Sequence, residues 1–308
     1  MANITAKDVA DLRAKTGCGM MDCKKALVKA EGNFDEAVKI LREMGLASAA
    51  KKADRIAAEG VVAILTEGNT AAMIEVNSET DFVAKNQSFR DFVNDILKTI
   101  IANKPADVAA LLACKYLDTD VTVEAELKNK ISIIGENMNI RRFVIVDGVL
   151  STYIHGGGTA GVIVTFDADD AAAANPGFAE VAYNVALQAA AMNCQYAVRA
   201  DVPASVIEGE KEILKAQIAN DPKSANKPAA IIEKMIDGRI NKYYETNCLE
   251  DQAYVKDDSV SVGKYLENES KNLGGSVKVK AFYRYEKGEG LEKRDDNFVA
   301  EIESMMKK

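Results

Sequence analysis

An internal near-repeat constrains the fold of this chain more than any other feature of its 308 residues. Residues 60–97 align with residues 148–187, and each copy reads as strand, glycine-containing turn, strand, connection and amphipathic helix. The matched residues are Gly60 with Gly148, Thr70 with Thr159, Asn86 with Asn175, and Phe89 with Phe178. Two copies are too few for a solenoid, because stacked repeats need several units to bury a continuous core. The repeat therefore predicts an α+β protein with two related subdomains, each an antiparallel sheet with helices on one side.

The residues before the repeat predict a three-helix module over residues 1–45. Thr5, followed three residues later by an acid, is typical of the capping box that begins a helix, and Gly32 suits the left-handed position that ends the second helix. The third helix is expected to end at Gly45. Residues 46–59 are rich in Ala and Lys and have little to bury, which predicts a helical or flexible linker.

Two amphipathic segments after the repeat predict a protruding antiparallel helical hairpin over residues 201–245. Pro203 can open the first helix, and the short turn "DPKSANKP" leads to a second helix in "AAIIEKMIDGRINKYY". Both segments carry Ile, Leu or Met along one seam, so the two helices are expected to pack on each other.

The remaining segments complete the division of the chain. The alternating run "SVKVKAFYRYE" predicts a late strand, and Asp295 or Asp296 can cap a terminal helix. The predicted ranges are 60–141 for the first subdomain, 142–200 and 246–290 for the second, and 291–308 for a C-terminal helical module.

The composition argues against a nucleic-acid partner and against a membrane anchor. Lys and Arg number 39 against 47 Asp and Glu, which gives a net charge of -8 and disfavours binding to a phosphate backbone. The cysteines Cys18, Cys23, Cys114, Cys194 and Cys248 are odd in number and scattered, so neither a disulfide framework nor a zinc site is expected. No signal-like segment and no run of eighteen apolar residues occurs. These features predict a cytoplasmic protein without a membrane partner.

The sequence is poor in catalytic machinery. His155 is the single histidine, and the "HGGG" run that it begins lacks the nucleophile elbow and second histidine of an esterase. The glycines that follow also satisfy a dinucleotide-binding spacing, but a strand rather than a helix comes after them, which favours a hairpin turn. No phosphate-binding P-loop is present. We therefore expect no catalytic residue, no cofactor and no metal site.

The stretch "SETDFVAKN" (residues 78–86) connects a predicted strand to a predicted helix and places a large aromatic beside an acid. One interpretation is structural: Ser78 or Thr80 caps a short helical turn, and Phe82 folds back into the core. The repeat weakens this interpretation, because the second copy has alanines where the first has residues 81–83, whereas a core position is expected to be large in both copies.

Six segments, in order along the full chain, resemble bacterial translation elongation factor Ts. They are "LRAKTGCGMMDCKKAL", "EVNSETDFVAKN", "IGENMNIRR", "HGGG", "IIEKMIDGRINKYY" and "YRYEKGEGLEK". The resemblance implies an N-terminal ubiquitin-associated-like module, a core of two related subdomains, a helical hairpin and a C-terminal module. It also implies a guanine nucleotide exchange factor that binds elongation factor Tu with GDP and promotes GDP release, so that GTP can replace it during translation elongation. Such a factor has no catalytic chemistry of its own.

The resemblance further implies which residues bind elongation factor Tu. The signature that disturbs the Mg²⁺ site of the partner corresponds to Thr80, Asp81, Phe82 and Val83. The N-terminal contact segment corresponds to Arg13, Met20 and Met21, and the contact of the second subdomain corresponds to His155 and Gly156. Because a G-domain holds its nucleotide partly through Mg²⁺ on the phosphates, displacing the groups that position the ion weakens the nucleotide site. Phe82 is therefore expected to be presented to the partner.

Some features depart from the family pattern, and alternatives remain open. Cys194 stands where relatives often have Pro, and extra residues occur around "CKYLDTDVTVEAEL" and "FDADDAAAANPGF". A helical adaptor without exchange activity is the main alternative of another class, and a small hydrolase around His155 ranks below both. The helical hairpin is also a candidate contact for a homodimer.

Overall fold

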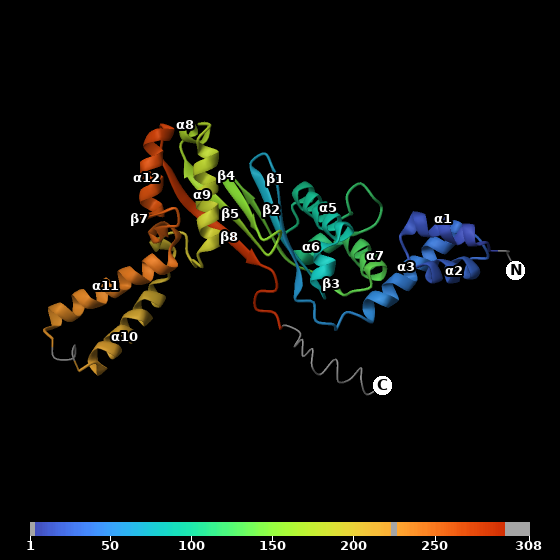
Figure 1. The fold of residues 1–308 in the computed structure, drawn as a ribbon, viewed down its shortest axis with the longest axis horizontal. Helices are drawn as coiled ribbons and strands as arrows, with labels where there is room; N and C mark the ends of the chain where they lie inside the picture. The colour runs from blue at the N-terminus through green and yellow to red at the C-terminus, as the bar shows by residue number, and fades with distance from the viewer. Residues whose placement is uncertain (1–3, 223–226, 293–308) are drawn as a thin grey trace.

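The structure is a computed structural model that describes residues 4–222 and 227–292. Figure 1 shows an elongated arrangement, with the N-terminal helices at one end, a two-helix arm at the other and two sheets between them. The combination of helices with antiparallel sheets confirms the predicted α+β class. The predicted C-terminal helix, with Asp295 or Asp296 as its cap, lies outside the described residues.

The N-terminal module consists of α1 (Ala6–Thr16), α2 (Met20–Lys29) and α3 (Phe34–Ala50). The predicted capping box is present at the start of α1: the hydroxyl of Thr5 accepts a hydrogen bond from the Asp8 amide at 3.2 Å, and the Asp8 carboxylate accepts one from the Thr5 amide at 2.8 Å. The helices enclose a small core of their own, to which Leu12, Leu27 and Leu41 contribute buried side chains.

The third helix differs from its prediction, because it continues through Gly45 to Ala50. Gly45 serves close packing here: a Cβ at this position would lie 3.4 Å from the Cβ of Ser132, in α7 (Val123–Ile134). A glycine inside a helix weakens it modestly, so packing against a neighbour can outweigh the tendency to end there. The first five residues of the predicted linker are therefore helical.

The first sheet has the strand order β1-β2-β3, with β1 (Glu59–Glu67), β2 (Thr70–Ser78) and β3 (Met138–Asp147) all antiparallel. Between β2 and β3 the chain forms α4 (Asp81–Lys85), α5 (Gln87–Asn103), α6 (Val108–Ala113) and α7. Phe89, Phe92 and Ile96 of α5 are fully buried against the sheet. The predicted boundary at residue 141 falls inside β3, so the first subdomain extends to Asp147.

The second sheet repeats this design with the order β4-β5-β8, made of β4 (Val149–His155), β5 (Ala160–Ala168) and β8 (Val277–Glu286). Its helices are α8 (Asp170–Ala173), α9 (Phe178–Ala191) and α12 (Val262–Leu273). Two short helical turns, η1 (Arg199–Asp201) and η2 (Leu249–Asp251), and a small hairpin of β6 (Ala253–Tyr254) and β7 (Asp257–Ser261) complete it. The strand-strand-helix order predicted from the repeat is confirmed in both copies.

The two sheets pack against each other on the faces that their helices leave free, as Figure 1 shows. Val62, Met73 and Ile163 are fully buried in the cluster between them. The two subdomains approach closely at Gly158, whose carbonyl accepts a hydrogen bond from the Val62 amide at 2.8 Å. A Cβ at Gly158 would lie 2.2 Å from a methyl group of Val61, so only glycine fits.

The arm is the predicted antiparallel hairpin, formed by α10 (Ala204–Asn220) and α11 (Ala229–Asn247). Its seam consists of four buried residues, Leu214, Ile218, Ile236 and Ile240. Pro203 precedes the first helical residue, as expected from its fixed φ and missing N–H. Residues 223–226 of the predicted turn lie outside the described part of the chain.

Candidate functional site

Thr80 fixes the start of the connection that contains Phe82. It is the N-cap of α4, where its hydroxyl accepts a hydrogen bond from the Val83 amide at 3.4 Å. The same hydroxyl donates to one carboxylate oxygen of Glu136 at 2.7 Å, and the Thr80 amide donates to the other at 3.0 Å. Because Glu136 lies between α7 and β3, the short helix is tied to a distant part of the subdomain.

The next residues divide between the core and the surface. Val83 is only 8% exposed and packs in the main cluster of the first subdomain, whereas Phe82 is 81% exposed. The interpretation of Phe82 as a core residue is therefore wrong. Asp81 lies beside it and accepts a hydrogen bond from the Lys85 ammonium at 2.6 Å, and this bond holds the pKa of Asp81 below its usual range. The surface of α4 thus presents an aromatic ring and a carboxylate.

His155 and Gly156 lie in a tight turn between β4 and β5. The three glycines of the turn have φ values of 56°, 65° and 110°, all in the region that favours glycine. The backbone carbonyl of His155 accepts hydrogen bonds from Gly158 and Thr159, each at 3.0 Å. The predicted hairpin turn is confirmed, and the exposed imidazole forms a hydrogen bond with the Tyr153 hydroxyl at 3.2 Å.

Arg90 brings the α4 segment and the glycine turn together. Its Nε donates to the carbonyl of Ala84 at 3.1 Å, and its Nη2 donates to the carbonyl of Gly157 at 3.0 Å. The two acceptors belong to different subdomains. The segments that contain Phe82 and His155 are therefore parts of one surface, although more than seventy residues separate them in the sequence.

Comparisons with known proteins agree on one family. The family model described as Elongation factor TS matches residues 79–289. This chain belongs to the elongation factor Ts family. Elongation factor Ts of Syntrophotalea carbinolica is 49% identical over 310 residues, with 99% of each chain covered. Those of Clostridioides difficile and Trichlorobacter lovleyi are 45% and 44% identical, with 100% and 97% of each chain covered. The family is one of translation elongation factors.

The elongation factor Ts resemblance also pointed to Arg13, Met20 and Met21, which lie apart from Phe82 and His155. Arg13 is exposed on α1, and Met20 and Met21 begin α2 with exposed fractions of 54% and 63%. Figure 1 places α1 and α2 at the end of the molecule, beyond α7. These residues therefore form a second candidate surface, separate from the first.

Sequence reasoning missed Arg90 and Glu136, which organise the candidate site. A charged residue at the start of an amphipathic helix reads as part of the solvated face, so nothing in the pattern distinguishes Arg90. Glu136 lies within "IGENMNIRR", a segment that carried the resemblance to elongation factor Ts without an assigned role. Its role is to hold the start of α4 by accepting two hydrogen bonds from Thr80, and the sequence pattern does not reveal these bonds.

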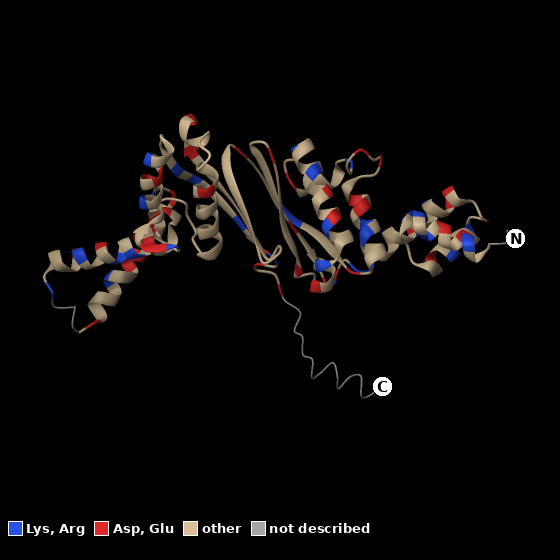
Figure 2. Cartoon of the chain, turned by 45° about the horizontal axis from the view of Figure 1, so that its top comes forward, with Lys and Arg blue, Asp and Glu red and all other residues tan. Residues whose placement is uncertain are grey.

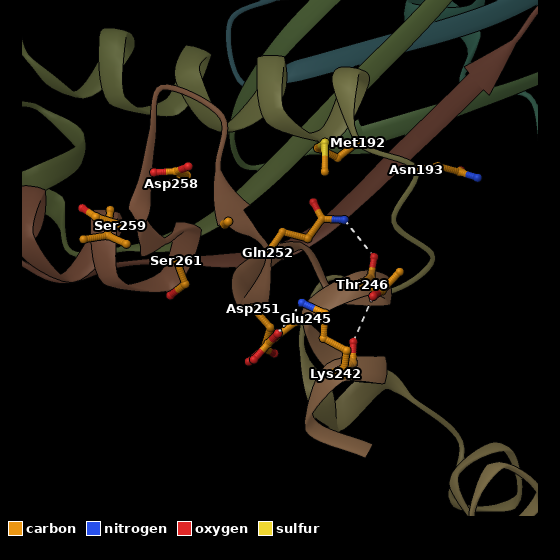
Figure 3. Close-up of a pocket in the computed structure, with 12 residues that line it drawn as sticks. Met192, Asn193, Lys242, Glu245, Thr246, Asp251, Gln252, Asp258, Ser259 and Ser261 are labelled. Carbon is orange, nitrogen blue, oxygen red and sulfur yellow. Dashed lines mark hydrogen bonds and ion pairs between the residues drawn. The ribbon is translucent and has the colours of Figure 1, made fainter. Parts of the chain in front are cut away.

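Beyond these two surfaces, the described part of this elongation factor Ts fold contains a cleft at the base of the arm. Within the described residues no group of three or more His, Cys, Asp or Glu could hold a metal ion, and no helix is long and apolar enough to cross a membrane. Figure 2 shows acidic and basic residues interspersed along the helices. An open cleft of about 650 Å³ lies at the base of the arm (Figure 3), where Gln252 donates to the carbonyl of Thr246 at 3.0 Å.

Proposed function

We propose that this protein is a guanine nucleotide exchange factor that binds elongation factor Tu with GDP and promotes GDP release during translation elongation. Phe82 carries this proposal, because an 81% exposed phenylalanine on a firmly anchored helix has no role in the fold. Aromatic side chains are enriched among the residues that dominate binding energy at protein interfaces. Membership of the elongation factor Ts family supports elongation factor Tu as the partner.

Phe82 acts as a wedge between side chains of the partner that position its Mg²⁺ ion. A G-domain holds nucleotide partly through Mg²⁺ bridging the phosphate oxygens, so displacement of those side chains weakens the whole nucleotide site. Asp81, beside the ring, competes for the hydrogen bonds of the displaced groups. Thr80 and Val83 hold the short helix that carries Phe82 in place, since Thr80 is hydrogen-bonded to Glu136 and Val83 is buried.

Two further contacts add binding energy, one on the surface of Phe82 and one on the N-terminal module. His155 and Gly156 contact the partner from the turn beside Phe82, where the absence of side chains on the glycines allows backbones to approach closely. Met20 and Met21 form an adaptable apolar contact on the N-terminal module, with Arg13 nearby in the sequence. The factor performs no covalent chemistry and acts in the cytoplasm, without direct contact to nucleic acid or membrane.

The arm provides a contact for a second copy of the chain. Ile213 and Ile231 are 51% and 46% exposed on its two helices, outside the buried seam. Pairing of two arms would cover both side chains. A mass measurement of the isolated protein tests this, because a monomer at micromolar concentration would contradict it.

Release of labelled GDP from elongation factor Tu tests the exchange activity. The expected result is a faster release when this protein is added in substoichiometric amount, since one molecule serves many partners in turn. A helical adaptor would bind elongation factor Tu, or another protein, without changing the release rate. An unchanged rate with the intact protein would therefore refute the proposal.

Reciprocity provides a second test of the same mechanism. If the protein lowers the affinity of its partner for GDP, GDP must lower the affinity of the partner for the protein by the same factor. Titration of GDP with Mg²⁺ into the preformed complex is expected to dissociate it. A complex that stays associated at saturating GDP would exclude this coupling.

A further inference from the structure

We infer that Arg90 is a positioning residue that holds the Phe82 helix and the His155 turn in one arrangement, so that both reach the partner together. The inference rests on the proposed function and adds to it a residue with no direct part in the contact. Arg90 belongs to α5, and the residue before it, Phe89, is fully buried in the core of the first subdomain. The side chain of Arg90 therefore extends from a rigid base.

The geometry suits the planar guanidinium group. Nε donates to the carbonyl of Ala84 at 3.1 Å, while Nη2 donates to the carbonyl of Gly157 at 3.0 Å. Ala84 lies in the last turn of α4, where carbonyls have no partner within the helix. Arginine offers several donors in a fixed plane, so a single side chain can bind two carbonyls in a defined relative position.

Arg90 adds a direct link between the turn and α4 to the other bonds of the turn. The bonds from Gly158 and Thr159 to His155 define the shape of the turn alone. The bond from Val62 attaches Gly158, the last glycine of the turn, to the first sheet, and the Lys287 amide donates to the Thr159 carbonyl at 2.9 Å. Consecutive glycines have wide conformational freedom, so the bond from Arg90 to Gly157 holds the tip of the turn beside α4, next to His155, which pairs with Ala160 of β5.

The expected consequence is a loss of exchange activity without a loss of folding. Binding sites require their contact groups to be held in position, because ordering them at the moment of binding costs free energy. Arg90→Ala should slow the catalysed release of GDP from elongation factor Tu by about 5- to 20-fold, within the usual range of coupling between sites. Lys98→Ala is the matched control. Lys98 lies on the same helix as Arg90, and its ammonium donates to Asp95 of that helix at 2.9 Å rather than to another segment of the described residues. This variant should leave the release rate unchanged.

A double variant separates positioning from a general structural role. In the His155→Ala background, Arg90→Ala should add less than about a 2-fold further loss, because interacting residues show non-additive effects. An equal loss in both backgrounds would overturn the inference. Arg90→Lys keeps the charge without the planar donors, so full activity of that variant would also overturn it.

Hydrogen exchange on the isolated chain gives a readout that needs no partner. Arg90→Ala should increase the exchange of the Gly158 and Thr159 amides, which donate to His155, while the amides of β5 keep their protection and the thermal midpoint stays nearly unchanged. Unchanged protection of the turn would show that Arg90 does not hold it. If the intact protein fails to accelerate GDP release, the proposed function falls, but this measurement still decides whether Arg90 fixes the turn.

Discussion

The connections α4 and α8 occupy the same place in the two copies of the repeat, yet they present different surfaces. Each begins just after the second strand, and each buries the residue at its third position, Val83 in α4 and Ala172 in α8, which are 8% and 0% exposed. The preceding residue points outward in both: Phe82 in the first copy and Ala171 in the second. The backbone design therefore does not require an aromatic at this position.

The second connection is tied to the fold at the equivalent position, as Thr80 and Glu136 tie the first. Asp169, before α8, accepts a hydrogen bond from the Ser276 amide at 2.7 Å, and its own amide donates to the Ser276 carbonyl at 3.0 Å. Asp170 begins α8 as Asp81 begins α4, so the expectation of an alanine opposite Asp81 is wrong. The difference between the two connections lies in the outward residue and its surroundings, which supports a binding role for α4 and not for α8.

The strands before these connections differ in a second way, and this difference predicts the largest effect. The match of Thr70 with Thr159 sets Glu75 opposite Val164, and both are fully buried. The Glu75 carboxylate accepts hydrogen bonds from Arg141 at 3.0 Å, from Arg142 at 2.7 Å and from the Gly288 amide at 2.8 Å. It therefore joins β2 to β3 and to the residues after β8.

Glu75→Gln should lower the free energy of unfolding by about 2 to 4 kcal/mol, because removing one charge of a buried pair leaves its partners uncompensated. Chemical denaturation measures this change. The matched control is Glu289→Gln, which removes a partner of Arg142 that is 51% exposed and should change stability by less than about 1 kcal/mol. Equal effects of the two variants would show that burial of Glu75 does not decide the outcome.

The same carboxylate predicts a pH dependence of stability. Burial raises the pKa of Glu75, but the hydrogen bonds from Gly288, Arg141, Asn77 and Arg142 outweigh it, and the net shift is downward. A lowered pKa means that the ionised form stabilises the fold above the unfolded pKa of about 4.3, and that this contribution is lost as the pH falls through the folded pKa. Unfolding midpoints between pH 7 and pH 3 should fall less steeply for Glu75→Gln. Parallel pH profiles of variant and wild type would contradict this assignment.

The fold was largely predictable from the sequence because both copies of the repeat show the same pattern of apolar residues, and each pattern predicts the same order of strands and helix. Each copy has a glycine at the start of its first strand, alternating apolar residues in its strands and an amphipathic helix after them. Few folds other than an antiparallel sheet covered by helices satisfy this pattern. The helix end predicted at Gly45 was wrong because a glycine can have two structural roles. Gly45 could end a helix or allow close packing against a neighbour.

The candidate site was less predictable, since exposure depends on contacts distant in sequence. The side chain of Phe82 could be assigned to the partner mostly through the family resemblance and partly through the alanines of the second copy, because an apolar residue in a short connection can either pack in the core or stay exposed. Arg90, Glu136 and Glu75 were missed for one reason. Each is a charged residue whose partners come from other elements, and no local spacing reveals such partners.

Phe82→Ala should have the next largest effect, and it tests the comparison of α4 with α8 directly. We expect the release of GDP from elongation factor Tu to slow by about 10- to 100-fold, the loss typical of an interface hot spot. Stability should stay within about 1 kcal/mol of wild type, because an 81% exposed ring leaves no cavity. Val83→Ala is the matched control on the same helix and should lower stability by about 1 to 3 kcal/mol. Normal stimulation by a folded Phe82→Ala variant would remove the proposed role of the ring.

The smallest effect is expected from the reverse change, Ala171→Phe, which gives α8 the outward aromatic of α4. Ala171 is exposed, so the added ring meets solvent and should change the free energy of unfolding by less than about 0.5 kcal/mol. Exchange activity should also stay unchanged, because α8 lacks the neighbouring glycine turn that Arg90 holds beside α4. The decisive measurement adds Ala171→Phe to Phe82→Ala and assays GDP release. If the ring acts only from its position in the first copy, the double variant remains as slow as Phe82→Ala. A recovery of exchange would mean that an exposed aromatic on either connection suffices and that the arrangement around α4 has no special function.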